Sequence, residues 1–217
     1  MKPFTPLAMV ALTLGLASCT SAPVHYHTLL APNEHATAVG QPVSFLIDVL
    51  PVGVPTQVDQ PQLIVRQGDS GVAVLESERW TGPLSDELRS ALSAELTQRL
   101  ATQDIAGLAQ PSDAPILRIK LQVRRFDAWP GTHTRLDADW SMGFTHQAGR
   151  RLVCSGRFDE SALGGYPEMV QAQQRMVAAL ANAMARNARG WEAYRAGLAQ
   201  TDAGVQCRGA ERSATTL

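Results

Sequence analysis

Three consecutive stretches between Leu117 and Phe158 alternate between apolar and polar side chains. A period of two residues predicts β-strands that pack one face on a core and turn the other toward water or a partner. The core-facing positions are Leu117, Ile119, Leu121 and Val123 in the first stretch, Leu136, Ala138, Trp140, Met142 and Phe144 in the second, and Leu152, Cys154, Gly156 and Phe158 in the third.

The polar positions of these strands carry opposite charges on neighbouring strands. They are Arg118, Lys120, Gln122 and Arg124, then Arg135, Asp137, Asp139 and Ser141, then Arg151, Ser155 and Arg157. Ion pairs across the strands would help to fix the strand order, at roughly a few tenths of a kcal/mol each. We interpret the face as solvated and self-neutralising, and a basic groove that binds anions is the alternative.

Two helices are predicted to cover the sheet. The first opens at Gly82-Pro83 and carries leucines at every fourth position, namely Leu84, Leu88, Leu92, Leu96 and Leu100. The second begins near Pro167, with a stripe of Met169, Met176, Val177, Leu180 and Met184. Trp191 and Tyr194 prolong that stripe, so they either cap the core or contact a partner, including a second copy of the chain. A coiled-coil partner for the leucine stripe is the sharper alternative to simple core packing.

The residues before the first helix predict short strands and one hairpin. Tyr26–Leu30 reads as a short strand, and Val43–Val49 as a strand buried on both faces. Leu63–Arg66 and Val72–Glu76 flank Gly68-Asp69-Ser70-Gly71, the tetrapeptide that surrounds the nucleophile of chymotrypsin-like proteases. No histidine and aspartate before Ser70 are placed to form a triad, so we predict a hairpin turn there rather than a hydrolase site.

The N-terminus has the anatomy of a bacterial lipoprotein signal. Met1-Lys2 precede an apolar stretch of ten residues, Leu7–Leu16, and then Leu16-Ala17-Ser18-Cys19 resembles a lipobox. We expect a signal peptide over residues 1–18, acylation of Cys19, a tether over 19–40, an α/β domain over 41–200 and a disordered tail over 201–217. An ordinary signal peptide with a chance cysteine is the alternative. Thr20 favours the outer membrane, because aspartate at that position is the usual retention signal for the inner membrane.

The net charge, the cysteines and the histidines limit the kinds of binding or catalytic site that the chain can contain. With 19 basic and 20 acidic residues the formal net charge is −1, which does not suggest nucleic-acid binding. Apart from Cys19, only Cys154 and Cys207 remain, and they either pair in the oxidising periplasm or leave Cys154 as a free buried thiol. His25 and His27 have a spacing that suits a metal, but no further ligand set completes a shell. We therefore expect no metal, no cofactor and no catalytic residues.

Several stretches together resemble the PqiC/YmbA-type ABC-transport auxiliary lipoproteins. They are Leu16–Cys19, Tyr26-His27-Thr28-Leu29, the segment PVGVPTQVDQPQLIVR over Pro51–Arg66, Glu78-Arg79-Trp80 before Pro83-Leu84, Ala138-Asp139-Trp140 and the last Ala-rich helix. The resemblance covers about residues 26–190. Two departures lie in its most specific block: Gln60 stands where the family often has arginine, and a Thr-Gln pair stands where an aromatic-leucine pair is common.

The resemblance implies a fold, a partner and a cellular location. The fold would be a single-domain, three-layer α/β sandwich with a mixed sheet, in the order strands–helix–strands–helix, without catalytic residues. The partner would be an MCE-domain protein of an intermembrane lipid-transport system, and the chain would be anchored in the outer membrane and face the periplasm. A structural lipoprotein that supports envelope assembly without handling lipid is the alternative.

Overall fold

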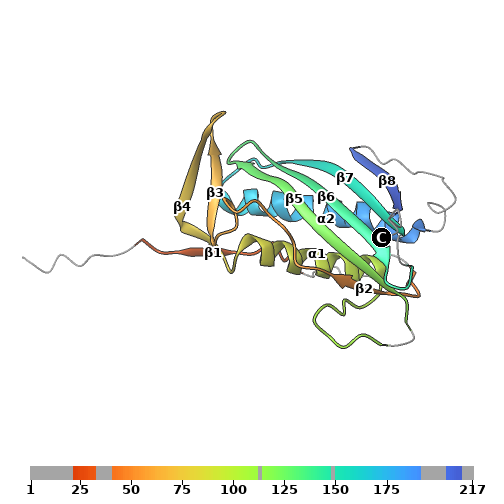
Figure 1. Cartoon of the computed structure of the whole chain (residues 1–217). Helices are drawn as coiled ribbons and strands as arrows, with labels where there is room; N and C mark the ends of the chain where they lie inside the picture. The colour runs from red at the N-terminus through yellow and green to blue at the C-terminus, as the bar shows by residue number, and fades with distance from the viewer. Residues whose placement is uncertain (1–21, 33–40, 112–113, 148–149, 192–203, 212–217) are drawn as a thin grey trace, which may run out of the picture.

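The computed structural model describes residues 22–32, 41–111, 114–147, 150–191 and 204–211. A five-stranded sheet contains, in spatial order, β2 (Leu46–Val49), β5 (Ile116–Trp129), β6 (His133–Phe144), β7 (Arg150–Ser161) and β8 (Val205–Glu211). A three-stranded sheet contains β1 (His25–His27), β4 (Gly71–Trp80) and β3 (Gln62–Gln67). Two helices, α1 (Leu84–Leu100) and α2 (Tyr166–Arg189), lie against one face of the larger sheet (Figure 1). In the described residues, neither helix is long and apolar enough to cross a bilayer.

The α/β class and the single domain that the sequence predicts are confirmed, as is the mixing of parallel and antiparallel strands. The order strands–helix–strands–helix also holds, with one further strand after α2. The strands are divided between two sheets, each of which is mixed: β2 runs parallel to β5, and β1 runs parallel to β4, whereas the remaining pairs are antiparallel.

The long strands β5, β6 and β7 form the centre of the larger sheet. Their register places Leu121 opposite Trp140, and Trp140 opposite Cys154. Cross-strand partners share a face, so the apolar positions of all three strands form one continuous surface. Beyond β2, the following loop continues along the edge of β5, where the Gly53 amide donates to the Leu121 carbonyl at 3.0 Å. A Cβ at Gly53 would lie 2.2 Å from Gln122 Oε1, so a larger residue there would require the Gln122 side chain to move.

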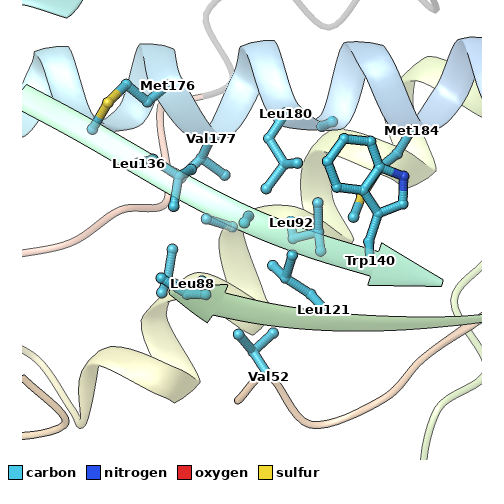
Figure 2. Packing of buried hydrophobic residues seen from close by; sticks show 14 of the residues in the cluster. Val52, Leu88, Leu92, Leu121, Leu136, Trp140, Met176, Val177, Leu180 and Met184 are labelled. Atoms are coloured by element: carbon cyan, nitrogen blue, oxygen red, sulfur yellow. The ribbon is translucent and has the colours of Figure 1, made fainter. Parts of the chain in front are cut away.

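The core lies between that apolar surface and the two helices. Figure 2 shows Leu121 and Trp140 from the sheet packed with Leu88 and Leu92 of α1 and with Leu180 and Met184 of α2. All five leucines of the α1 stripe are buried. The α1 helix begins after Pro83, as predicted, and α2 begins one residue before Pro167. The predicted leucine stripe is therefore core packing, and not a coiled-coil seam.

The smaller sheet is built on the predicted hairpin. Gln67 pairs with Gly71, so Gly68-Asp69-Ser70 forms the turn between β3 and β4, with Gly68 at φ +65°. Ser70 is exposed at this turn and is a turn residue, as the sequence analysis expected. The sheet stands at the end of the molecule where both helices begin (Figure 1).

The C-terminal strand was not expected. The sequence predicts disorder over 201–217, whereas Val205–Glu211 form β8 and pair with β7 from Arg150 to Gly156. The strand is short and contains Gly209, and Gly204 directly precedes it, so its strand signal is weak. Its pairing with β7 and a disulfide to that strand hold it in place, and both are tertiary contacts that local sequence does not report.

Candidate functional site

The face of the five-stranded sheet that points away from the helices is polar, and we call it the open face. Several ion pairs cross it from strand to strand, and three of them lie in its central part. Arg124 Nε lies 2.8 Å from Asp139 Oδ2, Arg157 Nε lies 2.8 Å from Asp137 Oδ1, and Arg135 Nε lies 2.6 Å from Asp159 Oδ1. The hydrogen bond and charge of Asp137 raise the pKa of the Arg157 guanidinium. These pairs agree with the self-neutralising surface that the alternation suggests.

A shallow groove runs across this part of the open face. Its lining side chains include Arg124, Asp137, Asp139, Ser155, Arg157 and Gln206, and the glycines Gly156 and Gly204 form part of its floor and wall. The lining contains a serine but no histidine. Because a serine hydroxyl needs an imidazole or an equivalent base to act as a nucleophile, Ser155 lacks the neighbour that such chemistry requires. The groove offers hydrogen-bond donors, acceptors and charges, which suit recognition of a polar partner.

Next to the groove, the open face becomes positively charged. Lys120, Ser141, Val153 and Arg208 are successive cross-strand neighbours on β5, β6, β7 and β8. Arg151 precedes Val153 by two residues and shares its face. We call Lys120, Arg151 and Arg208 the basic row. All three are exposed, and among the residues that the structure describes none of them has a carboxylate partner. The self-neutralising interpretation therefore fails for this part of the face.

Of the two predicted aromatic contacts, the structure describes only Trp191. Trp191 is only 4% exposed, and its ring meets Phe144 edge to face with centroids 5.5 Å apart. Of the two alternatives for Trp191, the structure fits capping of the core, because the indole packs against the end of β6. Tyr194 lies outside the described residues, and so does Cys19.

Cys154 and Cys207 form a disulfide in the structure. They face each other across β7 and β8 in the antiparallel register, on the side of the sheet that meets α2. Asn187 of α2 places its Nδ2 3.4 Å from each sulfur. The bond ties β8, which pairs with β7 alone among the described strands, to the centre of the molecule. The signal in the sequence was the alternation Val205-Gln206-Cys207-Arg208, which is too short to predict a strand.

The two histidines considered as metal ligands share one carboxylate instead. His25 Nδ1 lies 2.8 Å from Glu78 Oε1, and His27 Nε2 lies 2.5 Å from Glu78 Oε2. Burial alone would raise the pKa of Glu78, but the hydrogen bonds and charges of His27 and His25 outweigh it and lower this pKa. No group of three metal-ligating side chains suited to an ion occurs in the described residues. The cluster fastens β1 to β4 at the start of the folded chain.

A second buried carboxylate secures the segment after β1. Glu87 of α1 accepts hydrogen bonds from the Thr28 hydroxyl at 2.7 Å and from the Leu29 amide at 2.8 Å, and its other oxygen accepts from the Thr81 hydroxyl. Leu29 is 1% exposed and belongs to the core. Glu78 and Glu87 together fix the first folded residues against the smaller sheet and α1. Neither residue was singled out from the sequence for this role, because their partners lie more than fifty residues away.

The comparison with known families places the chain in a family. The model of the family described as "ABC-type transport auxiliary lipoprotein component" matches residues 27–185, well over half of the chain. The chain belongs to this family. Members are auxiliary lipoproteins of transport systems, as the resemblance in the sequence implied.

Solved structures share the fold. One, titled as an uncharacterized protein, is 19% identical with a TM-score of 0.60 and covers 76% of this chain and 99% of its own. Another, from Xanthomonas campestris, is 15% identical with a TM-score of 0.52 and covers 75% of this chain and 92% of its own. At these identities the likeness concerns the fold alone. A search of curated proteins gave no match.

Proposed function

We propose that this auxiliary lipoprotein is anchored in the outer membrane through acylated Cys19, faces the periplasm, and docks an MCE-domain protein of an intermembrane lipid-transport system. The observation that carries the proposal is the family match over residues 27–185. The lipobox-like Leu16–Cys19 supports the anchor, and the PqiC/YmbA-like stretches support the MCE partner. The role is non-enzymatic, and through lipid transport it supports envelope integrity.

The docking surface that we propose is the open face, in place of the aromatic pair. The other face of the sheet is covered by α1 and α2, so only the open face presents long strands to a partner (Figure 1). The groove supplies polar groups held in place by ion pairs, and the basic row supplies cations without carboxylate partners in the described chain. Complementary charge speeds association and selects partners. The matching surface on the MCE-domain protein should therefore carry acidic residues opposite Lys120, Arg151 and Arg208.

Charge reversal in the basic row tests this assignment. The double variant Arg151→Glu/Arg208→Glu should lose co-purification with the MCE-domain protein from solubilised envelopes while its melting temperature stays close to that of the wild type. Arg175→Glu is the matched control, because Arg175 is an exposed arginine on α2, whose side chain is 53% exposed. Retained co-purification by the double variant would remove the basic row from the interface.

The anchored wild-type protein tests whether the protein takes part in lipid transport at all. If it neither co-purifies nor crosslinks with any MCE-domain protein of its own envelope, the transport role fails, and the structural-lipoprotein alternative replaces it.

The anchor is tested separately. Cys19→Ala should give a soluble or unprocessed protein, and mature protein that still fractionates with membranes after this change would reject acylation at Cys19.

A further inference from the structure

Strand β1 presents two different sides. His25 and His27 turn toward Glu78, whereas Tyr26 lies between them in an extended strand and therefore points the other way. Val24 has the same parity as Tyr26. Tyr26 is 65% exposed and Val24 is 41% exposed. The clamp on Glu78 thus fixes β1 in an orientation that keeps an aromatic and an aliphatic side chain in solvent.

Exposed apolar side chains occur on the first described segment, which includes β1, and on the part of β4 near its turn with β3. Among the described residues seven large hydrophobic side chains are exposed, and five of them lie in residues 24–30 or in β4: Val24, Tyr26, Leu30, Val72 and Val74. Arg79, the register partner of Tyr26 on β4, lies beside it, with its Nε donating to the Glu76 carbonyl at 2.9 Å. A tyrosine with an arginine and aliphatic neighbours is the composition that favours the interface between lipid headgroups and acyl chains.

The chain length to the anchor sets how far this surface can lie from a membrane. Five residues separate Cys19 from Val24, and a fully extended chain spans at most about 3.6 Å per residue, or about 18 Å here. Tyr26 is only two residues farther. An acylated Cys19 at the bilayer surface therefore keeps Val24 within about 18 Å of that surface, and Tyr26 follows two residues later.

We propose that Val24, Tyr26 and Arg79 form a membrane-contact surface, which rests on the lipid surface and sets the orientation of the domain. This inference depends on the proposed anchor at Cys19. A lipid anchor alone leaves a domain free to tumble on its tether, and a second, weak interfacial contact restricts that freedom. The Tyr26 ring would lie at the headgroup level. Lipid phosphate would compete for the Arg79 guanidinium with Glu76, whose Oε2 lies 3.4 Å from Arg79 Nη2.

The orientation has a consequence for docking. With β1 on the membrane, the smaller sheet is the membrane-proximal end, and α1 leads away from it toward the loop that carries Leu108 (Figure 1). A helix of 17 residues spans about 25 Å. The strands of the open face would then extend from the membrane into the periplasm, where a bridging partner can reach them.

The test places a fluorescent label at Tyr26 and measures its surroundings. The added thiol of Tyr26→Cys would be the reactive one, because Cys154 and Cys207 are joined and Cys19 carries lipid. The lipidated protein, labelled with bimane, is reconstituted in vesicles of phosphatidylethanolamine with a minority of phosphatidylglycerol. Leu108→Cys is the matched control, because Leu108 is 67% exposed against 65% for Tyr26 and lies beyond the far end of α1. Val24→Cys repeats the measurement at a second position.

The label at position 26 should be quenched by nitroxide-bearing lipid and should be several-fold less accessible to aqueous iodide than the label at position 108. Equal iodide access at the two positions, on protein that floats with the vesicles, would overturn the membrane-contact surface and leave the anchor intact. Protein that does not float would overturn the anchor and this inference together. Protection of position 26 that appears in native envelopes and is absent in vesicles would assign the surface to a protein partner and overturn the proposal.

Discussion

The two faces of the five-stranded sheet are made by alternate residues of the same strands, yet different interactions stabilise them. On the helix side, Trp140 is 2% exposed and packs among leucines and methionines of both helices. On the open side, Asp137 and Asp139 form exposed ion pairs that water and salt screen. Burial of a large apolar side chain contributes several times more to stability than an exposed ion pair does. The helix side therefore carries the stability, which leaves the open side free to vary with a partner.

The largest expected effect is at Trp140. Trp140→Ala should lower the free energy of unfolding by about 3–5 kcal/mol, because it removes a large side chain from the centre of the core. Trp140→Phe is the control: the Trp140 indole Nε1 has no hydrogen-bond partner in the structure, so phenylalanine keeps most of the packing without stranding a donor. Chemical denaturation measures both variants. Equal stability of the alanine variant and the wild type would place Trp140 outside the core and reverse the two faces.

The second largest effect is expected at the disulfide between Cys154 and Cys207, at the edge of the sheet. Cys154→Ser/Cys207→Ser should destabilise the protein by about 2–4 kcal/mol, the usual range for a bridge that closes a loop of this kind. Thermal melts with and without reductant give the measurement: reduction should bring the wild type down to the level of the double variant and leave the double variant unchanged. A wild type that is indifferent to reductant would show that β8 is held without the bond.

The Glu78 cluster lies between the two extremes, since Glu78 and His27 are largely buried while the His25 side chain is 60% exposed. Glu78→Gln should cost about 1–3 kcal/mol at neutral pH, as charged hydrogen bonds in partly buried sites do. The pKa of Glu78 is lowered in the folded protein, so its contribution is complete above the ordinary value of 4.5 and disappears as the pH falls from 4.5 through the folded pKa. Unfolding curves of both proteins across that acidic window should therefore converge. Parallel pH profiles for the two proteins would mean that Glu78 does not hold the histidines.

The smallest effect is expected on the open face. Asp137→Asn breaks the pair with Arg157 and should change stability by no more than about 1 kcal/mol, with most of that change lost at high salt. The matched substitution is Asp48→Asn, which breaks the pair with Arg118 where the aspartate is buried, and it should cost more. A larger loss for Asp137 than for Asp48 would contradict the view that exposure to water weakens the ion pairs of the open face.

The elements that sequence predicted are those whose signal is local and repeated. Alternation identified the core side of β5–β7, the four-residue leucine spacing identified α1, and Gly68-Asp69-Ser70-Gly71 identified the turn of the β3–β4 hairpin. The rest depends on residues far apart in the chain. The parallel pairing of β1 with β4 and the sharing of Glu78 by two histidines join segments about fifty residues apart. The polar face was predicted in composition, but the separation of its basic row from its ion pairs follows from the strand register, which alternation does not specify.

Site-specific photocrosslinking in intact cells tests the docking surface most directly. A photoreactive residue at Ser155, in the groove of the open face, is compared with one at Arg175 on the outside of α2. The account predicts that the Ser155 position forms a crosslinked product containing an MCE-domain protein and that the Arg175 position does not. A crosslink to that protein from Arg175 alone, or none from Ser155 in anchored and folded protein, would contradict the claim that the open face is where this lipoprotein meets its transport partner.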